Sequence, residues 1–164
     1  MDFRKRATTL LLFIVTVFAA LPSMALEVGQ AFSLGDVRTL DGKTLSSDYF
    51  NNKYVIVQVW ASWCPYCHKQ NANMQKLYEQ TRDTDLRILT LSVDQNPANA
   101  EKYVKVNGVG FPVAMMTPEL AAAIGKRRGI PELYVISPQG RVVQKDFGLM
   151  VDADFEELSR YARR

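Results

Sequence analysis

Cysteine and histidine are scarce in this sequence, which holds two cysteines and one histidine among 164 residues. Two cysteines exclude the multi-bridge framework that holds small exported domains together, and the chain is long enough to bury a hydrophobic core without one. The cysteines and the histidine lie within five residues and supply only three ligands, so we predict no zinc site. Internal repeats and low-complexity segments are also missing, which favours one ordinary globular domain.

Long hydrophobic runs are missing except near the N-terminus. Basic residues at positions 4–6 precede an apolar run over 7–21, and Ser23-Met24-Ala25 resembles a small-x-small cleavage site. About 15 apolar residues are short for a membrane span. We therefore predict a signal peptide over 1–25, with an uncleaved membrane anchor as the alternative, followed by a domain over 26–164.

Strong net charge is missing once this N-terminal segment is set aside. The segment carries three basic residues and one acidic residue, so its removal lowers the formal net charge from +3 to +1. Nothing in the remaining chain favours nucleic acid as a partner. The one compact basic run, Lys126-Arg127-Arg128, is interpreted either as a solvated loop or as a site that steers an acidic partner.

Both cysteines lie in the stretch around which the chain is organised, Tyr54–Gln80. Residues 54–60 form an apolar run, which is typical of a central parallel strand covered by helices on both faces. Pro65 fits the first turn of a helix predicted over 65–80, because a proline there loses no usable N–H group. Cys64 and Cys67 therefore lie where a buried strand passes into a helix.

This position favours redox chemistry at the two cysteines. Free N–H groups and the positive end of the helix dipole stabilise a Cys64 thiolate, and Cys67 lies one turn along the same face, close enough for a disulfide. A structural disulfide usually closes a long loop, whereas this pair constrains the unfolded chain little. We therefore predict that Cys64 is the nucleophile and Cys67 the resolving thiol of a thiol–disulfide exchange protein.

The rest of the chain predicts further strands and helices in alternation. Ahead of the central strand, residues 31–45 hold two short apolar stretches around an Asp-Gly turn, which indicates a hairpin. The elements expected after the cysteine helix are a strand over 86–93, a helix over 98–106, an extended piece over 111–113, a helix over 118–124, a hairpin of strands over 133–137 and 142–147, and a final helix with Asp152 as its N-cap.

This order of elements resembles the thioredoxin superfamily. The segments AFSLGDVRTLDGKTL, VWASWCPYC, FPV and GIPELYVISPQG more narrowly resemble the exported TlpA-type proteins, which include the thioredoxin-like reductases of cytochrome c maturation. The resemblance extends from about residue 31 to residue 148. It implies an α/β, thioredoxin-like fold, in which a central mixed sheet is flanked by helices and carries an N-terminal hairpin and a central strand-helix insertion.

The resemblance also implies roles for the residues around the cysteines. Trp63 is expected to cover the disulfide, whereas Trp60 is expected in the core. Tyr66, together with Pro65, lies between the cysteines, where residues tune the reduction potential through the stability of the thiolate.

One proline is implied to shape the site. Pro131 matches the family proline whose preceding peptide bond is cis, and its implied role is to hold the backbone of Ile130 beside the cysteines. A client segment would pair there as an added strand. Pro112 is the competing candidate, but no strand-turn-strand follows it.

Proton transfer is implied to depend on Glu132. A glutamate directly after the proline resembles the cytochrome c maturation reductases, and the alternative is an exposed acid at the start of a strand. Thioredoxins have a buried aspartate where this chain has Gln58, and an amide cannot accept the proton of the resolving thiol. The resemblance therefore implies that Glu132 or water accepts it.

A second reading of the cysteine motif concerns haem. The residues from Cys64 to His68 also match C-x-x-C-H, the attachment pattern of c-type haem. The methionines available as axial partners are Met74, Met115, Met116 and Met150. A buried strand before the motif and an α/β layout after it do not suit a small helical cytochrome, so haem attachment is the lesser alternative.

The sequence thus predicts an exported thiol–disulfide oxidoreductase, located in the bacterial periplasm as a soluble or inner-membrane-anchored protein. We expect a reductase of a dedicated pathway such as cytochrome c maturation, with a disulfide oxidase or isomerase as the alternative enzyme. The Cys64–Cys67 disulfide would be its only redox group, without a cofactor or metal. Protein clients and, in an oxidising compartment, a membrane-linked electron donor would be its partners.

Overall fold

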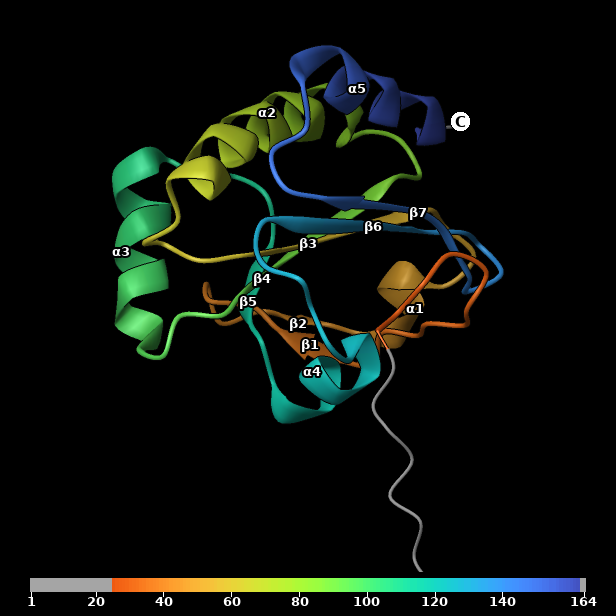
Figure 1. Ribbon diagram of the computed structural model, residues 1–164, viewed down its shortest axis with the longest axis horizontal. Coiled ribbons are helices and arrows are strands. Elements are labelled where there is room, and N and C mark those ends of the chain that lie inside the picture. The colour runs from red at the N-terminus through yellow and green to blue at the C-terminus, as the bar shows by residue number, and fades with distance from the viewer. Residues whose placement is uncertain (1–24, 163–164) are drawn as a thin grey trace, which may run out of the picture.

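A five-stranded mixed sheet lies at the centre of the computed structural model, which describes residues 25–162 (Figure 1). Its strands, in spatial order, are β5 (Val113–Met115), β4 (Arg87–Ser92), β3 (Val55–Trp60), β6 (Glu132–Ile136) and β7 (Val142–Phe147). The central β3 pairs parallel with β4 and antiparallel with β6. All of its residues are buried, as the apolar run predicts.

Helices cover both faces of this sheet (Figure 1). One face carries α2 (Pro65–Thr81), α5 (Asp152–Glu156) and the 3-10 helix η1 (Glu157–Tyr161), and the other carries α1 (Ser47–Phe50) and α4 (Pro118–Ile124). The helix α3 (Pro97–Asn107) lies beside the start of α2, where the ring of Tyr103 is 4.7 Å from that of His68. The chain thus forms the predicted mixed sheet between helical layers.

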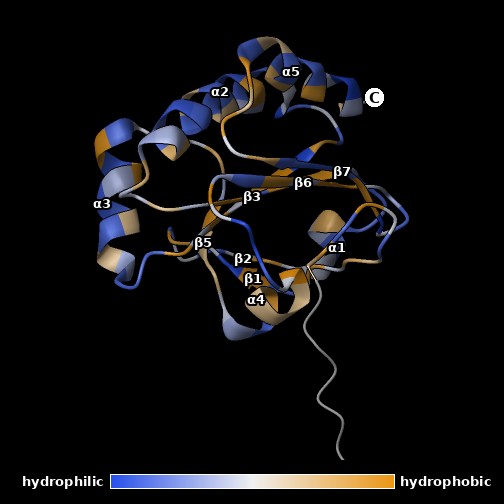
Figure 2. Ribbon diagram, in the orientation of Figure 1, coloured by the Kyte–Doolittle hydropathy of each residue, from blue (hydrophilic) through white to orange (hydrophobic). Residues whose placement is uncertain are grey.

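Two hydrophobic clusters, one on each face of the sheet, form the core. Side chains alternate along β3, so that Ile56 and Trp60 belong to the cluster under α2, whereas Val57 and Val59 belong to the other. Figure 2 shows the same division, with hydrophobic colours on the strands between the helical layers and hydrophilic colours over much of α2.

The predicted N-terminal hairpin is present as β1 (Val37–Arg38) and β2 (Thr44–Leu45). Asp41 in its turn forms an ion pair with Lys43 at 2.8 Å and accepts a hydrogen bond from the Thr39 hydroxyl. The contact with Lys43 and then that with Thr39 lower the pKa of Asp41 to about 2. The hairpin meets the edge strand β5 through a bridge between Thr39 and Ala114, which covers part of an otherwise open sheet edge.

The observed elements confirm the predicted order and correct one detail. α4 and β7 have the predicted bounds, and the other major helices and strands differ by one or two residues, as is usual for element ends. Asp152 is not the N-cap of α5. Val151 takes that position, and Asp152 is the first helical residue, where its Oδ1 accepts a hydrogen bond from Asn73 Nδ2 at 2.9 Å.

The predicted signal peptide over 1–25 falls almost entirely outside the described residues. Within residues 25–162, no helix is both long enough and apolar enough to cross a membrane. The prediction of cleavage or anchoring therefore stays a prediction.

Candidate functional site

A disulfide joins the two cysteines at the N-terminus of α2. Cys64 is the N-cap residue, Pro65 follows it as the first helical residue, and the Cα atoms of Cys64 and Cys67 are 5.2 Å apart. The Cys67 N–H donates a hydrogen bond to Cys64 Sγ at 3.2 Å. Because this N–H lies at the positive end of the helix dipole, it also stabilises a Cys64 thiolate after reduction.

The two sulfurs differ in their access to solvent. Cys64 keeps 4% of its surface exposed, whereas Cys67 is fully buried in the core under α2. Attack from outside the protein therefore reaches Cys64 first. The assignment of Cys64 as the nucleophile and Cys67 as the resolving thiol stays a prediction.

The segment that holds Ile130 and Pro131, which we call the proline loop, lies against the disulfide. The peptide bond between Ile130 and Pro131 is cis, and it is the only cis bond within residues 25–162, so Pro112 is excluded as the cis-proline. Ile130 O lies 3.9 Å from Cys64 Sγ, and the Gly148 N–H donates a hydrogen bond to Pro131 O at 2.9 Å. The backbone of Ile130 thus lies beside the sulfur that a client would contact.

A buried aspartate, Asp94, holds the turn that leads into the disulfide. Its carboxylate accepts hydrogen bonds from the Ser62 N–H at 2.9 Å, from the Ser62 hydroxyl at 2.7 Å and from the Ser92 hydroxyl at 2.7 Å. No functional role was assigned to Asp94 from the sequence. Its position in the sequence could have indicated such a role, because Asp94 directly follows the strand predicted parallel to the one that leads to the cysteines. The carboxyl ends of parallel strands lie at the same edge of a sheet.

His68 completes the support of the same turn. Its Nε2 lies 2.6 Å from Ser62 O, and its ring is 4.7 Å from the ring of Tyr103. The side chain is therefore engaged with protein groups, and both cysteines of the C-x-x-C-H match are joined to each other. These contacts support the redox interpretation of the motif over haem attachment.

Aromatic side chains border the disulfide on the surface. Trp63 and Tyr66 are 66% and 65% exposed, whereas Trp60 is buried, as predicted, and donates its Nε1–H to Thr90 Oγ1 at 3.2 Å. Exposed apolar groups gathered at one place are typical of a binding surface. The roles expected of Trp63 as a cover and of Tyr66 in tuning the potential stay predictions.

Gln58 belongs to a buried network of neutral amides under α2. Its Nε2 donates to Asn71 Oδ1 at 2.6 Å, and its Oε1 accepts a hydrogen bond from Gln70 Nε2 at 3.1 Å. Gln70 Oε1 accepts the Met150 N–H at 3.0 Å. None of these amides titrates, so the network cannot accept the proton of Cys67. Among the described residues, the buried Asn71 Nδ2 has no hydrogen-bond partner.

Glu132 is fully buried, so the alternative of an exposed acid is wrong. Its Oε1 lies 3.5 Å from Lys145 Nζ, and Lys145 also contacts Glu27 Oε1 at 2.8 Å. Burial and then the neighbouring Glu132 raise the pKa of Tyr134. These side chains form an ionic cluster at the start of β6, in which Glu132 is buried and Glu27 is exposed.

The strand register places this cluster relative to the cysteines. Glu132 pairs with Val59, and Leu133 pairs with Gln58. Residues that face each other across a strand pair lie on the same side of the sheet, so Glu132 lies on the side opposite to α2. Proton transfer between Glu132 and Cys67 would have to pass around the end of β3, and this role stays a prediction.

We expect a Glu132→Gln variant to slow disulfide reduction and to lower the pKa of the cysteine thiols without unfolding the protein. The carboxylate disfavours a nearby thiolate by repulsion, so its neutralisation favours the thiolate, and an amide cannot carry a proton. Reduction rates against pH and ultraviolet absorbance of the thiolate measure both effects. Glu27→Gln, which removes the exposed partner of Lys145, is the matched control. Unchanged rates and pKa values in Glu132→Gln would leave the residue a structural role only.

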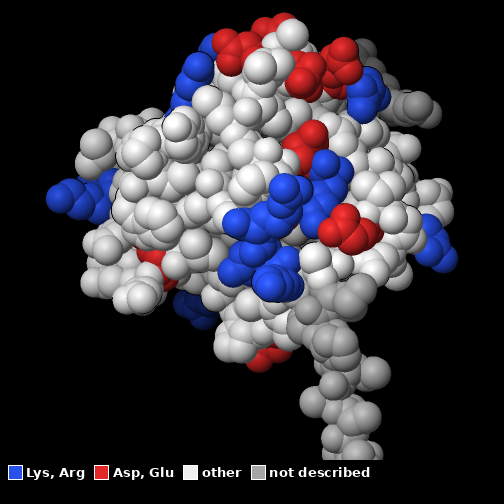
Figure 3. Space-filling model, in the orientation of Figure 1, with Lys and Arg blue, Asp and Glu red and all other residues white. Residues whose placement is uncertain are grey.

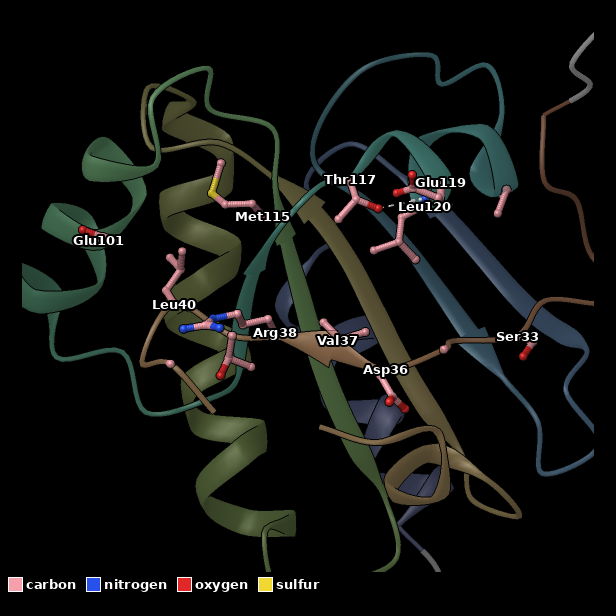
Figure 4. Close-up of a pocket in the computed structure, with 14 residues that line it drawn as sticks. Ser33, Asp36, Val37, Arg38, Leu40, Glu101, Met115, Thr117, Glu119 and Leu120 are labelled. Atoms are coloured by element: carbon pink, nitrogen blue, oxygen red, sulfur yellow. Dashed lines mark hydrogen bonds between the residues drawn. The ribbon is translucent and has the colours of Figure 1, made fainter. Parts of the chain in front are cut away.

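A cavity of about 810 Å³ lies away from the disulfide (Figure 4). Arg38 and Leu40 enter it from the hairpin segment, Met115 from β5 and Glu119 from α4, and Glu101 of α3 closes one side. Its lining includes no residue of α2 or of the proline loop. The cavity therefore takes no part in the geometry around the cysteines.

The fold and the site together define a class of protein. A helix that begins with a Cys-x-x-Cys disulfide after the central strand of a mixed sheet, with a cis-proline against it, is the arrangement of a thiol–disulfide oxidoreductase with the thioredoxin fold. The chain belongs to the AhpC/TSA family, which matches residues 26–145.

Comparison with known proteins agrees with this class. The chain is 27% identical over 135 residues to the thiol-disulfide oxidoreductase ResA of Bacillus thuringiensis subsp. konkukian, covering 80% of this chain and 76% of that relative. It is 29% identical to a crystallised thiol:disulfide interchange protein of Chlorobium tepidum, with a TM-score of 0.72 over 81% of this chain and 97% of the other. StoA from Bacillus subtilis, at 23% identity, shares the fold with a TM-score of 0.67, over 83% of this chain and 98% of StoA.

Proposed function

We propose that this protein is an exported reductase of protein disulfides that serves a dedicated pathway such as cytochrome c maturation. The observation that carries the proposal is the distance of 3.9 Å between Ile130 O and Cys64 Sγ. The backbone of Ile130 therefore lies beside the nucleophile, where a client segment can pair with it as an added strand. The similarity to ResA supports the class. The N-terminal sequence supports export, with the periplasm as the compartment.

The reaction begins with the reduced protein. The Cys64 thiolate attacks one sulfur of a client disulfide, the client S–S bond breaks, and the second client sulfur leaves as a thiolate. The new bond joins Cys64 Sγ to the client. The N–H of Cys67, now 3.2 Å from Cys64 Sγ, favours the thiolate before the attack.

Cys67 completes the exchange. Its thiol loses a proton, attacks Cys64 Sγ and releases the remaining client sulfur as a thiolate, so the client gains two electrons and the protein becomes the Cys64–Cys67 disulfide. The buried amides beside Gln58 cannot take that proton, and we assign the task to Glu132 or to water. A dithiol donor, linked to the membrane, must then reduce the protein again.

The surroundings of Cys64 support reduction over oxidation. A strongly oxidising pair needs a reduced form that is stabilised, as by cations beside the thiolate. Here the residues between the cysteines, Pro65 and Tyr66, carry no cation, and the only histidine contacts Ser62 O. Within residues 25–162, the Cys67 N–H is the only hydrogen-bond donor to Cys64 Sγ. We infer that the Cys64 thiolate is stabilised weakly enough for the pair to give up electrons.

A peptide that carries the Cys-x-x-Cys-His motif of apocytochrome c, in its disulfide form, tests the direction of exchange. We expect the reduced protein to reduce this peptide, with the Cys64–Cys67 disulfide dominant at equilibrium, because the dithiol of the client is a weaker reductant than that of the protein. Mass spectrometry of acid-quenched mixtures measures both redox states. Predominant oxidation of the reduced peptide by the disulfide form of the protein would instead support the oxidase alternative.

A further inference from the structure

The loop between α4 and β6 carries three consecutive basic residues and ends at Pro131. We call residues 125–131 the basic loop, because Lys126, Arg127 and Arg128 follow one another in it. Lys126 and Arg128 are exposed, and Arg127 is half-buried. Figure 3 shows basic side chains gathered on the face where Figure 1 places this loop.

The basic loop is held against the rim of the site. The Arg128 guanidinium lies over the ring of Phe147 at 5.0 Å from its centroid, and a Cβ atom at Gly129 would lie only 3.1 Å from the same ring. Phe147 itself remains 48% exposed. Arginine over an aromatic ring fixes the direction of the guanidinium while leaving its N–H groups available.

In the described part of the chain, the basic loop lacks carboxylate partners. Among residues 25–162, none of its three cations forms an ion pair. The acids of the neighbouring cluster, Glu27 and Glu132, both pair with Lys145. The loop therefore presents uncompensated positive charge to an approaching molecule.

Arg128 is close along the chain to the residue that contacts the reacting sulfur. Arg128 precedes Ile130 by two residues, which is at most about 7 Å of extended backbone, and Ile130 O lies 3.9 Å from Cys64 Sγ. A client strand that pairs with Ile130 advances by about 3.3 Å per residue. Its residues two or three positions from the reacting cysteine would thus lie opposite Arg128.

We propose that the basic loop docks clients whose reacting cysteine is flanked, two or three residues away, by aspartate or glutamate. This inference rests on the proposed reductase function and adds the charge of the client. Attraction at the loop raises the rate at which acidic clients meet Cys64, and the Arg128 guanidinium donates hydrogen bonds to a carboxylate beside the paired strand.

An acidic polypeptide fits this surface better than an anionic membrane does. The Leu26 N–H donates a hydrogen bond to Ile124 O at 2.8 Å, close to the start of the basic loop. An uncleaved anchor over residues 1–25 would therefore bring the loop near a membrane, and a lipid surface is the competing partner. A membrane laid on the loop would also cover Phe147 and the backbone of Ile130, which the client must reach. The contact between Arg128 and Phe147 instead places the Arg128 guanidinium at the rim of the site.

Two cysteine-containing peptide disulfides of equal length test the proposal, one with glutamates at the positions two and three residues from the cysteine and one with glutamines there. At low salt, we expect the reduced protein to reduce the acidic peptide about tenfold faster, and salt of about 1 M should remove the difference. The double variant Lys126→Gln/Arg128→Gln should lose the preference while keeping the rate on the neutral peptide. The control Lys76→Gln/Arg82→Gln removes the same amount of charge from α2 and its C-cap, outside the basic loop.

A binding measurement separates this inference from the proposed function. Acidic peptide with serine in place of cysteine should bind the wild-type protein about tenfold more tightly than the double variant by fluorescence anisotropy. Binding without any disulfide exchange would sustain the docking surface and contradict the reductase. Equal rates and equal affinities for acidic and neutral peptides would overturn the docking surface, as would a double variant that loses only its binding to phosphatidylglycerol vesicles.

Discussion

A Cys67→Ser variant, produced in cells that contain its natural partners, is expected to accumulate a mixed disulfide through Cys64. Cys64 is the more accessible sulfur at the helix terminus, and removal of the buried resolving thiol leaves the first exchange intact but blocks the second. Non-reducing electrophoresis should show an adduct that reductant separates, and mass spectrometry of its other half identifies the client or donor.

The matched variant is Cys64→Ser, which keeps a single cysteine but in the buried position. We expect little or no adduct, because outside molecules do not reach Cys67 at 0% exposure. Equal trapping by both variants, or stable adducts only through Cys67, would reverse the assignment of nucleophile and resolving thiol.

An Asp94→Ala variant is expected to lose both stability and activity. Removal of the carboxylate leaves the Ser62 N–H and two hydroxyls without their acceptor, and loss of hydrogen bonds to a charged group costs about 2 to 4 kcal/mol. The turn before Trp63 and Cys64 then loses its fixed position, which should slow reduction of a peptide disulfide by about tenfold or more. Urea unfolding and second-order reduction rates measure the two effects.

Two further variants separate the role of this hydrogen-bond network from a general effect of charge. Asp85→Ala, at an exposed position in the loop before β4, should change stability by less than about 0.5 kcal/mol. Asp94→Asn keeps the shape of the side chain but offers only one oxygen as acceptor, so it should fall between wild type and Asp94→Ala. Stability and rates for Asp94→Ala equal to those for Asp85→Ala would show that Asp94 does not hold the active-site turn.

Local patterns in the sequence were sufficient to predict most of the helices and strands, whereas the family resemblance supplied their arrangement around a mixed sheet. The apolar run of β3, the proline at the start of α2 and the Asp-Gly turn each specify a local structure with few alternatives. The resemblance supplied the cis bond before Pro131, which local pattern alone does not indicate. Asp152 was placed one residue wrongly because an aspartate suits both the N-cap and the first turn of a helix.

What the sequence could not supply depends on contacts between distant segments. Asp94 lies 32 residues from Ser62, and their hydrogen bonds form only when β3 and β4 pair in register. Burial of Glu132 likewise requires β7, which brings Lys145, and the N-terminal segment, which brings Glu27. The amide network around Gln58 needs two residues of α2 at the correct turn. Each of these is a property of tertiary packing.

The reduction potential of the Cys64–Cys67 pair tests the central claim most directly. Equilibration of the purified protein with glutathione or dithiothreitol buffers, followed by quantification of both redox states, gives the value. A reductase requires a potential near that of thioredoxin, about −270 mV, and this is the result we predict. A potential near −120 mV would make the protein a strong oxidant and would contradict the proposed function.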